Sequence, residues 1–107
     1  MTEYHYETDT RKYFAKLGGL SKDLMASFGA FNSKAFEEGA LSVKTKELIA
    51  VAAAHITRCP YCIAGHTQRA KQVGCTEQEI AEAIFVAVAM SAGASMAHSS
   101  IAMKALE

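Results

Sequence analysis

The chain contains a single proline, and it has no run of alternating β-branched residues long enough to make a strand. No repeat, low-complexity tract or linker divides its 107 residues. Alanine is abundant instead, and apolar residues recur at helical spacing. The absences disfavour a sheet. The sequence therefore predicts an all-α fold, a compact bundle of five or six helices forming a single domain over residues 1–107.

Neither sign of charge is in excess, because eleven Lys and Arg residues balance eleven Asp and Glu residues. A balanced chain has no electrostatic footprint for nucleic acid, so we expect no nucleic-acid partner. The segment from Met1 to Arg11 is polar and acidic and does not resemble a signal peptide. A cytoplasmic location is expected.

The longest apolar stretch, from Ala83 to Ala97, contains no charged residue. A membrane span needs about 20 predominantly apolar residues. This stretch is shorter, begins beside Glu82, and includes Ser91 and Gly93. We therefore expect it to be buried between protein helices, with no membrane partner.

Helix start and stop signals divide the first part of the chain. A helix is expected from about Thr8 to Leu17, ending at the pair Gly18-Gly19. Ser21 is a suitable N-cap for a second helix, which should end by Gly39. An apolar stripe on that helix is interpreted as core: Leu24, Phe28, Phe31 and Ala35.

The middle of the chain has clearer signals. Ser42 can cap a third helix, which is almost wholly apolar from Leu48 to Ile56 and is expected to be buried. Pro60 suits the first position of a fourth helix, because its missing N–H would have no partner there. Cys59 then occupies the N-cap.

Gly74 is a natural residue to follow the fourth helix, and Thr76 with Glu79 forms a capping box for the next one. Cys75 and Ile80 flank that start as a hydrophobic staple, so Cys75 is interpreted as a small packing residue. The last helical stretch, from Ile80 to Ala105, is expected to break near Gly93.

Two of the expected helices lack a polar face, although a domain of this size buries only about two-thirds of its unfolded surface. Apolar surface is left over. Small residues at four-residue steps would let another helix approach closely, and they predict a homo-oligomer: Ala89, Gly93 and Ala97.

The residues with chemical potential are the cysteines, since a close pair in a reducing compartment points to catalysis or metal. Cys62 and His66 are four residues apart on one helix face, and Cys59 at the N-cap lies on the same side. The partial positive charge of the helix N-terminus favours the thiolate at both sulfurs.

Glu47 lies on the preceding helix, twelve residues before Cys59. If the two helices form an antiparallel hairpin, His66 comes within about two turns of Glu47, a gap that a long side chain or one water can close. A carboxylate that orients an imidazole raises its basicity, which would make His66 a competent base for Cys62.

The tetrapeptide from Cys59 to Cys62, Cys-Pro-Tyr-Cys, is also the active-site sequence of glutaredoxins. Glutaredoxins place it after a β-strand and use a second, cis proline, whereas this chain has one proline and no visible strand. The pair is therefore interpreted as convergent redox chemistry on a helical scaffold.

From Leu41 to His98 the sequence resembles the alkylhydroperoxidase AhpD-like group of the carboxymuconolactone decarboxylase family. The resemblance rests on the spacing of one Glu, two Cys and one His and on four short motifs: Lys44-Thr45-Lys46-Glu47-Leu48, Arg58-Cys59-Pro60-Tyr61-Cys62, Gly65-His66-Thr67 and Gly74-Cys75-Thr76. It implies an all-helical fold that assembles into trimers or hexamers.

By position, the resemblance implies that Cys62 becomes a sulfenic acid and that Cys59 resolves it as a disulfide. His66 and Glu47 match the proton relay. Some family members have a histidine where this chain has Tyr61, and a tyrosine does not titrate near neutrality. The implied substrate is a hydroperoxide or a disulfide, and the implied electron donor is a dihydrolipoyl-bearing protein or another dithiol.

Zinc binding is an alternative, because Cys59, Cys62 and His66 are zinc-ligand types and His55 or His98 would complete a set of four. A decarboxylase-type or non-catalytic family member is a further alternative, although that branch does not depend on cysteine. The main prediction is a cysteine-dependent peroxidase with neither a cofactor nor a metal ion.

Overall fold

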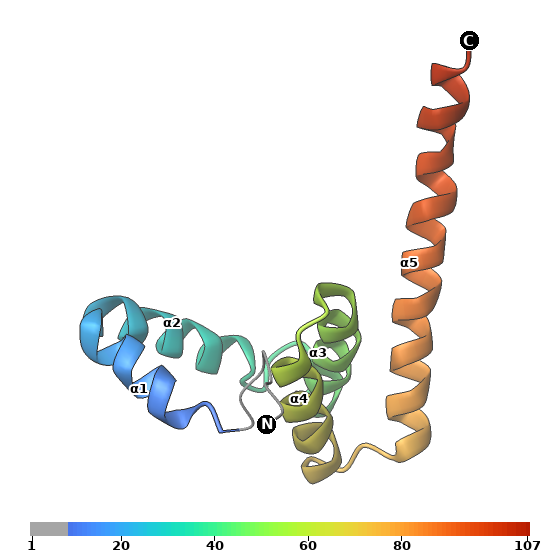
Figure 1. Ribbon diagram of the computed structural model, residues 1–107. Coiled ribbons are helices and arrows are strands. Elements are labelled where there is room, and N and C mark those ends of the chain that lie inside the picture. Colours follow the sequence, from blue (N-terminus) through green and yellow to red (C-terminus); the bar gives the residue numbers. More distant parts are fainter. Residues whose placement is uncertain (1–8) are drawn as a thin grey trace, which may run out of the picture. The chain divides into compact units, whose positions relative to one another are not determined.

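The computed structural model describes residues 9–107 and contains five α-helices and no strand in that range. The all-α prediction is confirmed. The helices are labelled in Figure 1: α1 (Arg11–Leu20), α2 (Lys22–Ala35), α3 (Val43–Thr57), α4 (Pro60–Gln72) and α5 (Glu77–Ala105).

The chain divides into two compact units between Glu38 and Gly39. The first unit contains α1 and α2, and the second contains α3, α4 and α5. The expectation of one domain over residues 1–107 stays a prediction. The expected start of the first helix at Thr8 lies outside the described residues.

In the first unit, α1 does not end at the glycine pair but continues through it to Leu20. Gly18 has a packing role inside the helix, because a Cβ built on it would lie 3.1 Å from Cγ of Met25 on α2. Gly18 therefore acts as a point of close approach inside the helix and not as its end. Ser21 is the N-cap of α2 as predicted, although its side chain makes no capping hydrogen bond.

The apolar stripe on α2 lies on one face, but the prediction that it is core is wrong for this chain. Leu24 is 74% exposed, Phe28 63% and Phe31 71%. Leu24 and Phe28 line an open groove together with residues of both helices: Phe14, Leu17, Ser21 and Met25. Two short helices cannot enclose side chains of this size, so the stripe stays at the surface of its unit. The helix ends at Ala35, before Gly39.

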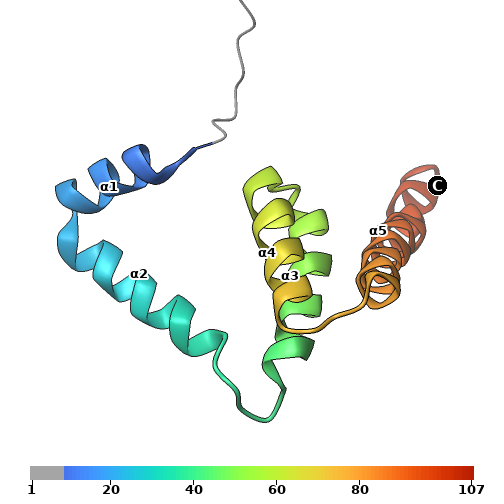
Figure 2. The ribbon, with the colours of Figure 1, turned by 90° about the horizontal axis from the view of Figure 1, so that it is seen from below.

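The second unit is built on a hairpin of α3 and α4, which lie side by side in both views (Figures 1 and 2). Ser42 caps α3 as predicted, and its Oγ accepts a hydrogen bond of 3.0 Å from the N–H of Thr45. Arg58 ends α3 in the left-handed conformation, with φ of 58°. Cys59 then takes an extended conformation as the N-cap of α4, and Pro60 is the first helical residue.

The core of this unit is one cluster of small and medium side chains. Val51 of α3 and Ala70 of α4 are fully buried. Cys75 and Ile80 join the same cluster from the start of α5, which agrees with the staple prediction. The prediction that α3 is a buried helix holds only for the side of the helix with Glu47, Val51 and Ala54, because Ile49 is 52% exposed.

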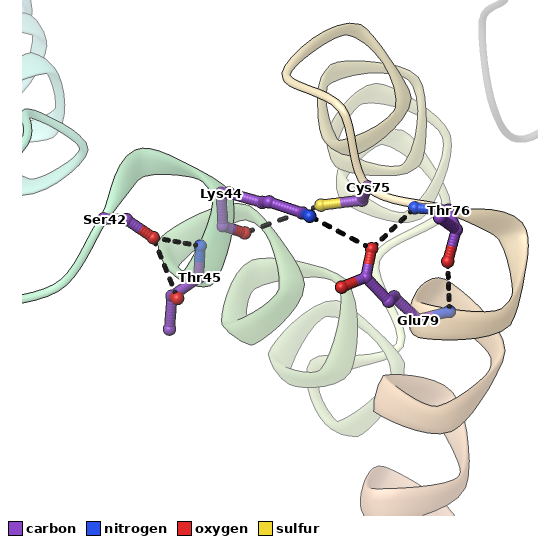
Figure 3. A network of polar contacts seen from close by, with 6 residues as sticks. All are labelled: Ser42, Lys44, Thr45, Cys75, Thr76 and Glu79. Carbon is purple, nitrogen blue, oxygen red and sulfur yellow. Dashed lines mark hydrogen bonds and ion pairs between the residues drawn. The ribbon is translucent and has the colours of Figure 1, made fainter.

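The start of α5 is fixed by the predicted capping box. The Glu79 N–H donates to Oγ1 of Thr76 at 3.1 Å, and the Thr76 N–H donates to Oε1 of Glu79 at 2.8 Å (Figure 3). The same Glu79 oxygen pairs with Nζ of Lys44 on α3 at 3.3 Å. The capping residue thus also ties α5 to the beginning of α3.

The helix α5 runs unbroken for 29 residues, so the predicted break near Gly93 is wrong. One glycine in a helix interior costs only about 1 kcal/mol, and the flanking alanines and methionines are good helix formers. The expected burial between helices is also not found: Ala87 is buried, but Phe85 is 69% exposed and Val86 59%. Among the described helices, α5 is the one that is long and apolar enough to cross a membrane by length and composition.

Candidate active site

Cys59 and Cys62 meet at the N-terminus of α4. The extended backbone at Cys59 turns its side chain back over the first helical turn, where Sγ accepts a hydrogen bond of 3.2 Å from the N–H of Cys62. The two sulfurs lie 2.7 Å apart, both as free thiols that are partly exposed. The sequence predicts that Cys59, Cys62 and His66 lie on one side of the helix, and the structure brings the two sulfurs of this group into contact.

The contact between the two thiols separates their acidities. The pKa of Cys59 is lowered, first by the hydrogen bond with the Cys62 thiol and then by the backbone N–H groups of Cys62 and Tyr61. The pKa of Cys62 is raised, first by the same contact with Cys59, then by burial and by the negative charge that Cys59 acquires. Two sulfurs this close do not both ionise readily, so the first negative charge rests mainly on Cys59.

Glu47 and His66 form a direct contact between α3 and α4. Oε1 of Glu47 lies 2.7 Å from Nδ1 of His66, so no bridging water is needed. Glu47 is only 4% exposed and is the one buried charged residue in the described part of the chain. Burying a carboxylate is unfavourable unless it is paired, and His66 provides that pairing.

This contact also determines which nitrogen of His66 is basic. A carboxylate accepts hydrogen bonds, so Nδ1 of His66 holds the proton that it donates to Glu47. The other ring nitrogen, Nε2, is then the one able to accept a proton. Because His66 is four residues after Cys62, it lies on the helix face of that thiol.

Two other histidines that were considered do not join this group. Nδ1 of His55 lies 2.7 Å from the backbone carbonyl of Val51, one turn back on its own helix. His98 is exposed on the second half of α5. Within residues 9–107, no three His, Cys, Asp or Glu side chains are grouped so as to hold a metal ion.

Arg69 is a residue that the sequence interpretation missed. Its positive charge lowers the pKa of Cys62, against the effects of Cys59 and of burial. The signal was present in the sequence, because Arg69 is seven residues after Cys62 and therefore on the same helix face.

The chain is similar to a known protein family and to proteins of known structure. The sequence profile of the carboxymuconolactone decarboxylase family matches residues 22–105. The chain belongs to this family. The matched residues include α2 of the first unit and all three helices of the second. The match is consistent with the AhpD-like group of the family.

Relatives from bacteria and an archaeon support the assignment to the carboxymuconolactone decarboxylase family. Uncharacterized protein 4 in the cox locus of Paracoccus denitrificans is 48% identical over 99 residues, which is 90% of this chain and 89% of that protein. A carboxymuconolactone decarboxylase family protein from Legionella pneumophila is 36% identical in its crystal structure, with a TM-score of 0.71 over 88% of this chain and 84% of its own. A crystal structure from Methanobacterium thermoautotrophicum gives a TM-score of 0.74 at 35% identity, over 78% and 93% of the two chains.

Proposed function

We propose that the protein is a cysteine-dependent peroxidase or disulfide reductase of the AhpD-like type, with Cys59, Cys62, His66 and Glu47 as its reacting and proton-handling groups. The observation behind this proposal is the buried Glu47–His66 contact beside a free thiol pair. Family membership alone does not distinguish a peroxidase from a decarboxylase. A dithiol with an oriented imidazole is machinery for proton and sulfur chemistry.

The reaction begins at Cys62. His66 takes the thiol proton, and the thiolate attacks one oxygen of the hydroperoxide. The O–O bond breaks, Cys62 becomes a sulfenic acid, and the departing alkoxide takes up a proton to give the alcohol. The sulfur is oxidised by two electrons, and the peroxide is reduced by two.

Cys59 completes the oxidative half. Its sulfur attacks the sulfenic acid, a disulfide forms between Cys59 and Cys62, and water leaves. The lowered pKa of Cys59 suits this role, because a thiolate is the form that attacks. The same property also makes Cys59 the competing candidate for the first attack, so the division of roles is a matter for experiment.

A dithiol donor then restores the reduced pair by thiol–disulfide exchange and is itself left as a disulfide. We propose a dihydrolipoyl-bearing protein or another dithiol for this role. We also propose a soluble, cytoplasmic location, since a reducing compartment keeps an exposed thiol pair ready for reaction.

The deciding experiment is peroxide consumption by the pre-reduced protein, with dihydrolipoamide as the donor and with dithiothreitol as the comparison. We expect faster turnover with dihydrolipoamide. Cys62→Ser should abolish the catalysed reaction, whereas Cys75→Ser should not affect it because Cys75 is 5% exposed and outside the pair. Equal rates for the wild type and Cys62→Ser would refute the proposal, and a metal assay on the same sample tests the zinc alternative.

A further inference from the structure

The Arg69 side chain, in the second half of α4, points back along the helix toward the thiol pair. A Cβ built on Gly65 would lie 3.3 Å from a terminal guanidinium nitrogen of Arg69, so the Arg69 side chain lies along the helix over Gly65. Helical side chains point toward the N-terminus of their helix, which here is the end that holds Cys62. Cys62, Gly65 and Arg69 occupy one face at spacings of three and four residues.

Gly65 leaves room for the Arg69 side chain. Glycine inside a helix is less stable than alanine by about 0.5–1 kcal/mol, so nothing in the helix itself favours it at position 65. A Cβ at this position would lie 3.3 Å from the Arg69 guanidinium, which is closer than most Cβ contacts, so the guanidinium would have to shift away. Gly65 thus leaves the path along the helix open for the cation.

The charge of Arg69 is also uncompensated. Lys44 is paired with Glu79 and Lys71 with Glu77, whereas no carboxylate is paired with Arg69 within residues 9–107. Solvent weakens the field of the exposed Arg69 cation at the nearby thiol, but no paired carboxylate among these residues cancels it.

We propose that Arg69 is a positioning residue of the thiol site, held over Gly65 so that its cation stabilises the thiolate of Cys62 at the moment of attack. The inference deepens the proposed function and depends on it only in taking Cys62 as the attacking thiol. A fixed cation at this place lowers the energy of the charged state of Cys62 and of negative charge developing on a peroxide oxygen. It thereby offsets the burial that disfavours the charged form of Cys62.

The effect of Arg69 on Cys62 has to be separated from the effects of the other charged or titratable groups nearby. Cys59 adjoins Cys62 at the N-cap, and His66 follows one turn later on α4. From α3 comes Glu47, which contacts His66, and α5 contributes Glu79, which pairs with Lys44 of α3. The substitution Cys59→Ser removes the thiol that contacts Cys62 and leaves Cys62 as the only partly exposed cysteine.

The test measures the rate at which iodoacetamide alkylates Cys62 as a function of pH, in the Cys59→Ser background. This readout needs neither a peroxide nor an electron donor, so it is independent of whether the protein proves to be a peroxidase. Arg69→Gln should raise the pKa of Cys62 and slow alkylation at pH 7 by about two- to fivefold, the size expected of one partly screened charge. Arg69→Lys should retain part of the wild-type rate.

One control variant, one further variant and the salt dependence make the result specific. Lys71→Gln removes the same charge from the same helix, but Lys71 is paired with Glu77, so its pH profile should not move. Gly65→Ala should shift the profile in the direction of Arg69→Gln while leaving the helix at least as stable. Added salt should slow alkylation of the Arg69 protein more than of Arg69→Gln. An Arg69→Gln profile that coincides with the parent profile overturns the inference, and so does an equal shift in Lys71→Gln.

Discussion

The Glu47 carboxylate contacts Nδ1 of His66 at 2.7 Å, although the two residues are 19 positions apart in the chain and belong to different helices. The contact is largely withdrawn from water, with the two side chains 5% and 16% exposed. A carboxylate–imidazole contact in such surroundings is screened little by salt, so Glu47 holds the imidazole in one tautomer and one orientation.

The first prediction is that Glu47→Gln slows the reaction with peroxide by about tenfold or more at pH 7, because an amide does not support an imidazolium as a carboxylate does. The amide oxygen of Gln can still accept the hydrogen bond from Nδ1, so the fold should survive. Stopped-flow peroxide kinetics and a far-UV circular dichroism spectrum measure the two effects.

Glu77→Gln is the matched control for that variant, since Glu77 is an exposed carboxylate paired with Lys71 at the start of α5. It should react at the wild-type rate. If both variants slow the reaction equally, the effect comes from the net charge and not from the contact with His66.

The second prediction assigns the roles of the two thiols. Both sulfurs lie in the first turn of α4, where the helix dipole contributes only about 0.3–1 kcal/mol to each. His66 is on the face of Cys62 and a positioned base contributes about 10²–10⁴-fold, so Cys62 should be the attacking thiol. Cys59→Ser should give a trappable sulfenic acid on Cys62, and Cys62→Ser should react slowly and give none.

A dimedone-type probe with mass spectrometry decides between the two assignments. The lowered pKa of Cys59 is a real argument for the opposite order. Labelling of Cys59 in the Cys62→Ser protein at the wild-type rate would show that the acidity of the N-cap thiol, and not the base, determines which sulfur attacks.

The third prediction concerns the pH dependence of the reduced pair. The contact with Cys62 is the largest contribution to the lowered pKa of Cys59, so the first thiolate should form below the ordinary range of a cysteine. Cys62→Ala should move that titration upward, although not fully, because the backbone N–H of residue 62 remains. Burial raises the pKa of Cys75, which therefore titrates later and does not obscure the measurement.

Thiolate absorbance in the ultraviolet measures this titration directly. A first titration that stays unchanged in Cys62→Ala would mean that the two thiols do not interact in solution as they do here.

The fourth prediction is that mild oxidation forms a disulfide between Cys59 and Cys62 and leaves Cys75 reduced. Cys75 is buried in the core cluster, and its thiol lies 3.6 Å from the backbone carbonyl of Lys44 (Figure 3). Peptide mapping after oxidation identifies the pair. A major disulfide that includes Cys75 would mean that the start of α5 opens far more readily than its capping box suggests.

Much of the second unit was predictable, because its signals are local. Ser42, Thr76 and Glu79 make their capping bonds with residues three positions away, and Cys59 with Pro60 defines the start of α4 by backbone chemistry alone. The meeting of Glu47 with His66 was also accessible, since a short turn forces two helices into a hairpin and the distances along each helix can be counted.

The failed predictions depend on contacts that the sequence does not display. An apolar stripe indicates that one face of a helix avoids water, but it does not indicate what covers that face. The sequence therefore assigns Phe28 and Phe85 to a core that this chain alone does not form. The sequence predicts breaks at the pair Gly18-Gly19 and near Gly93 because glycine is a weak helix former, yet one or two residues of low propensity do not end these helices. The spacing of seven residues from Cys62 puts Arg69 on the face of that thiol, but the sequence does not show that the Arg69 side chain lies over Gly65.

The fifth prediction is that the protein is a homo-oligomer, a trimer or a hexamer. The second half of α5 exposes large apolar side chains at intervals of one or two turns, including Met96 at 74% and Ile101 at 67%. Exposed apolar surface of this extent normally marks an interface, and the small residue Gly93, about one turn before Met96, allows close helix contact. Light scattering at micromolar concentration should therefore give a mass well above the 11.5 kDa of one chain.

A charge placed on that face tests the cause. Ile101→Glu should reduce the measured mass, because burying an unpaired carboxylate in a helix interface is strongly unfavourable. The control Lys104→Glu, near the end of α5, changes the net charge by more but should leave the mass unchanged. Sedimentation with lipid vesicles tests the other use of this face, insertion into a membrane, since α5 is long and apolar enough to span a bilayer. A monodisperse 11.5 kDa species that stays in the supernatant would contradict the oligomer and leave the apolar face of α5 without a partner.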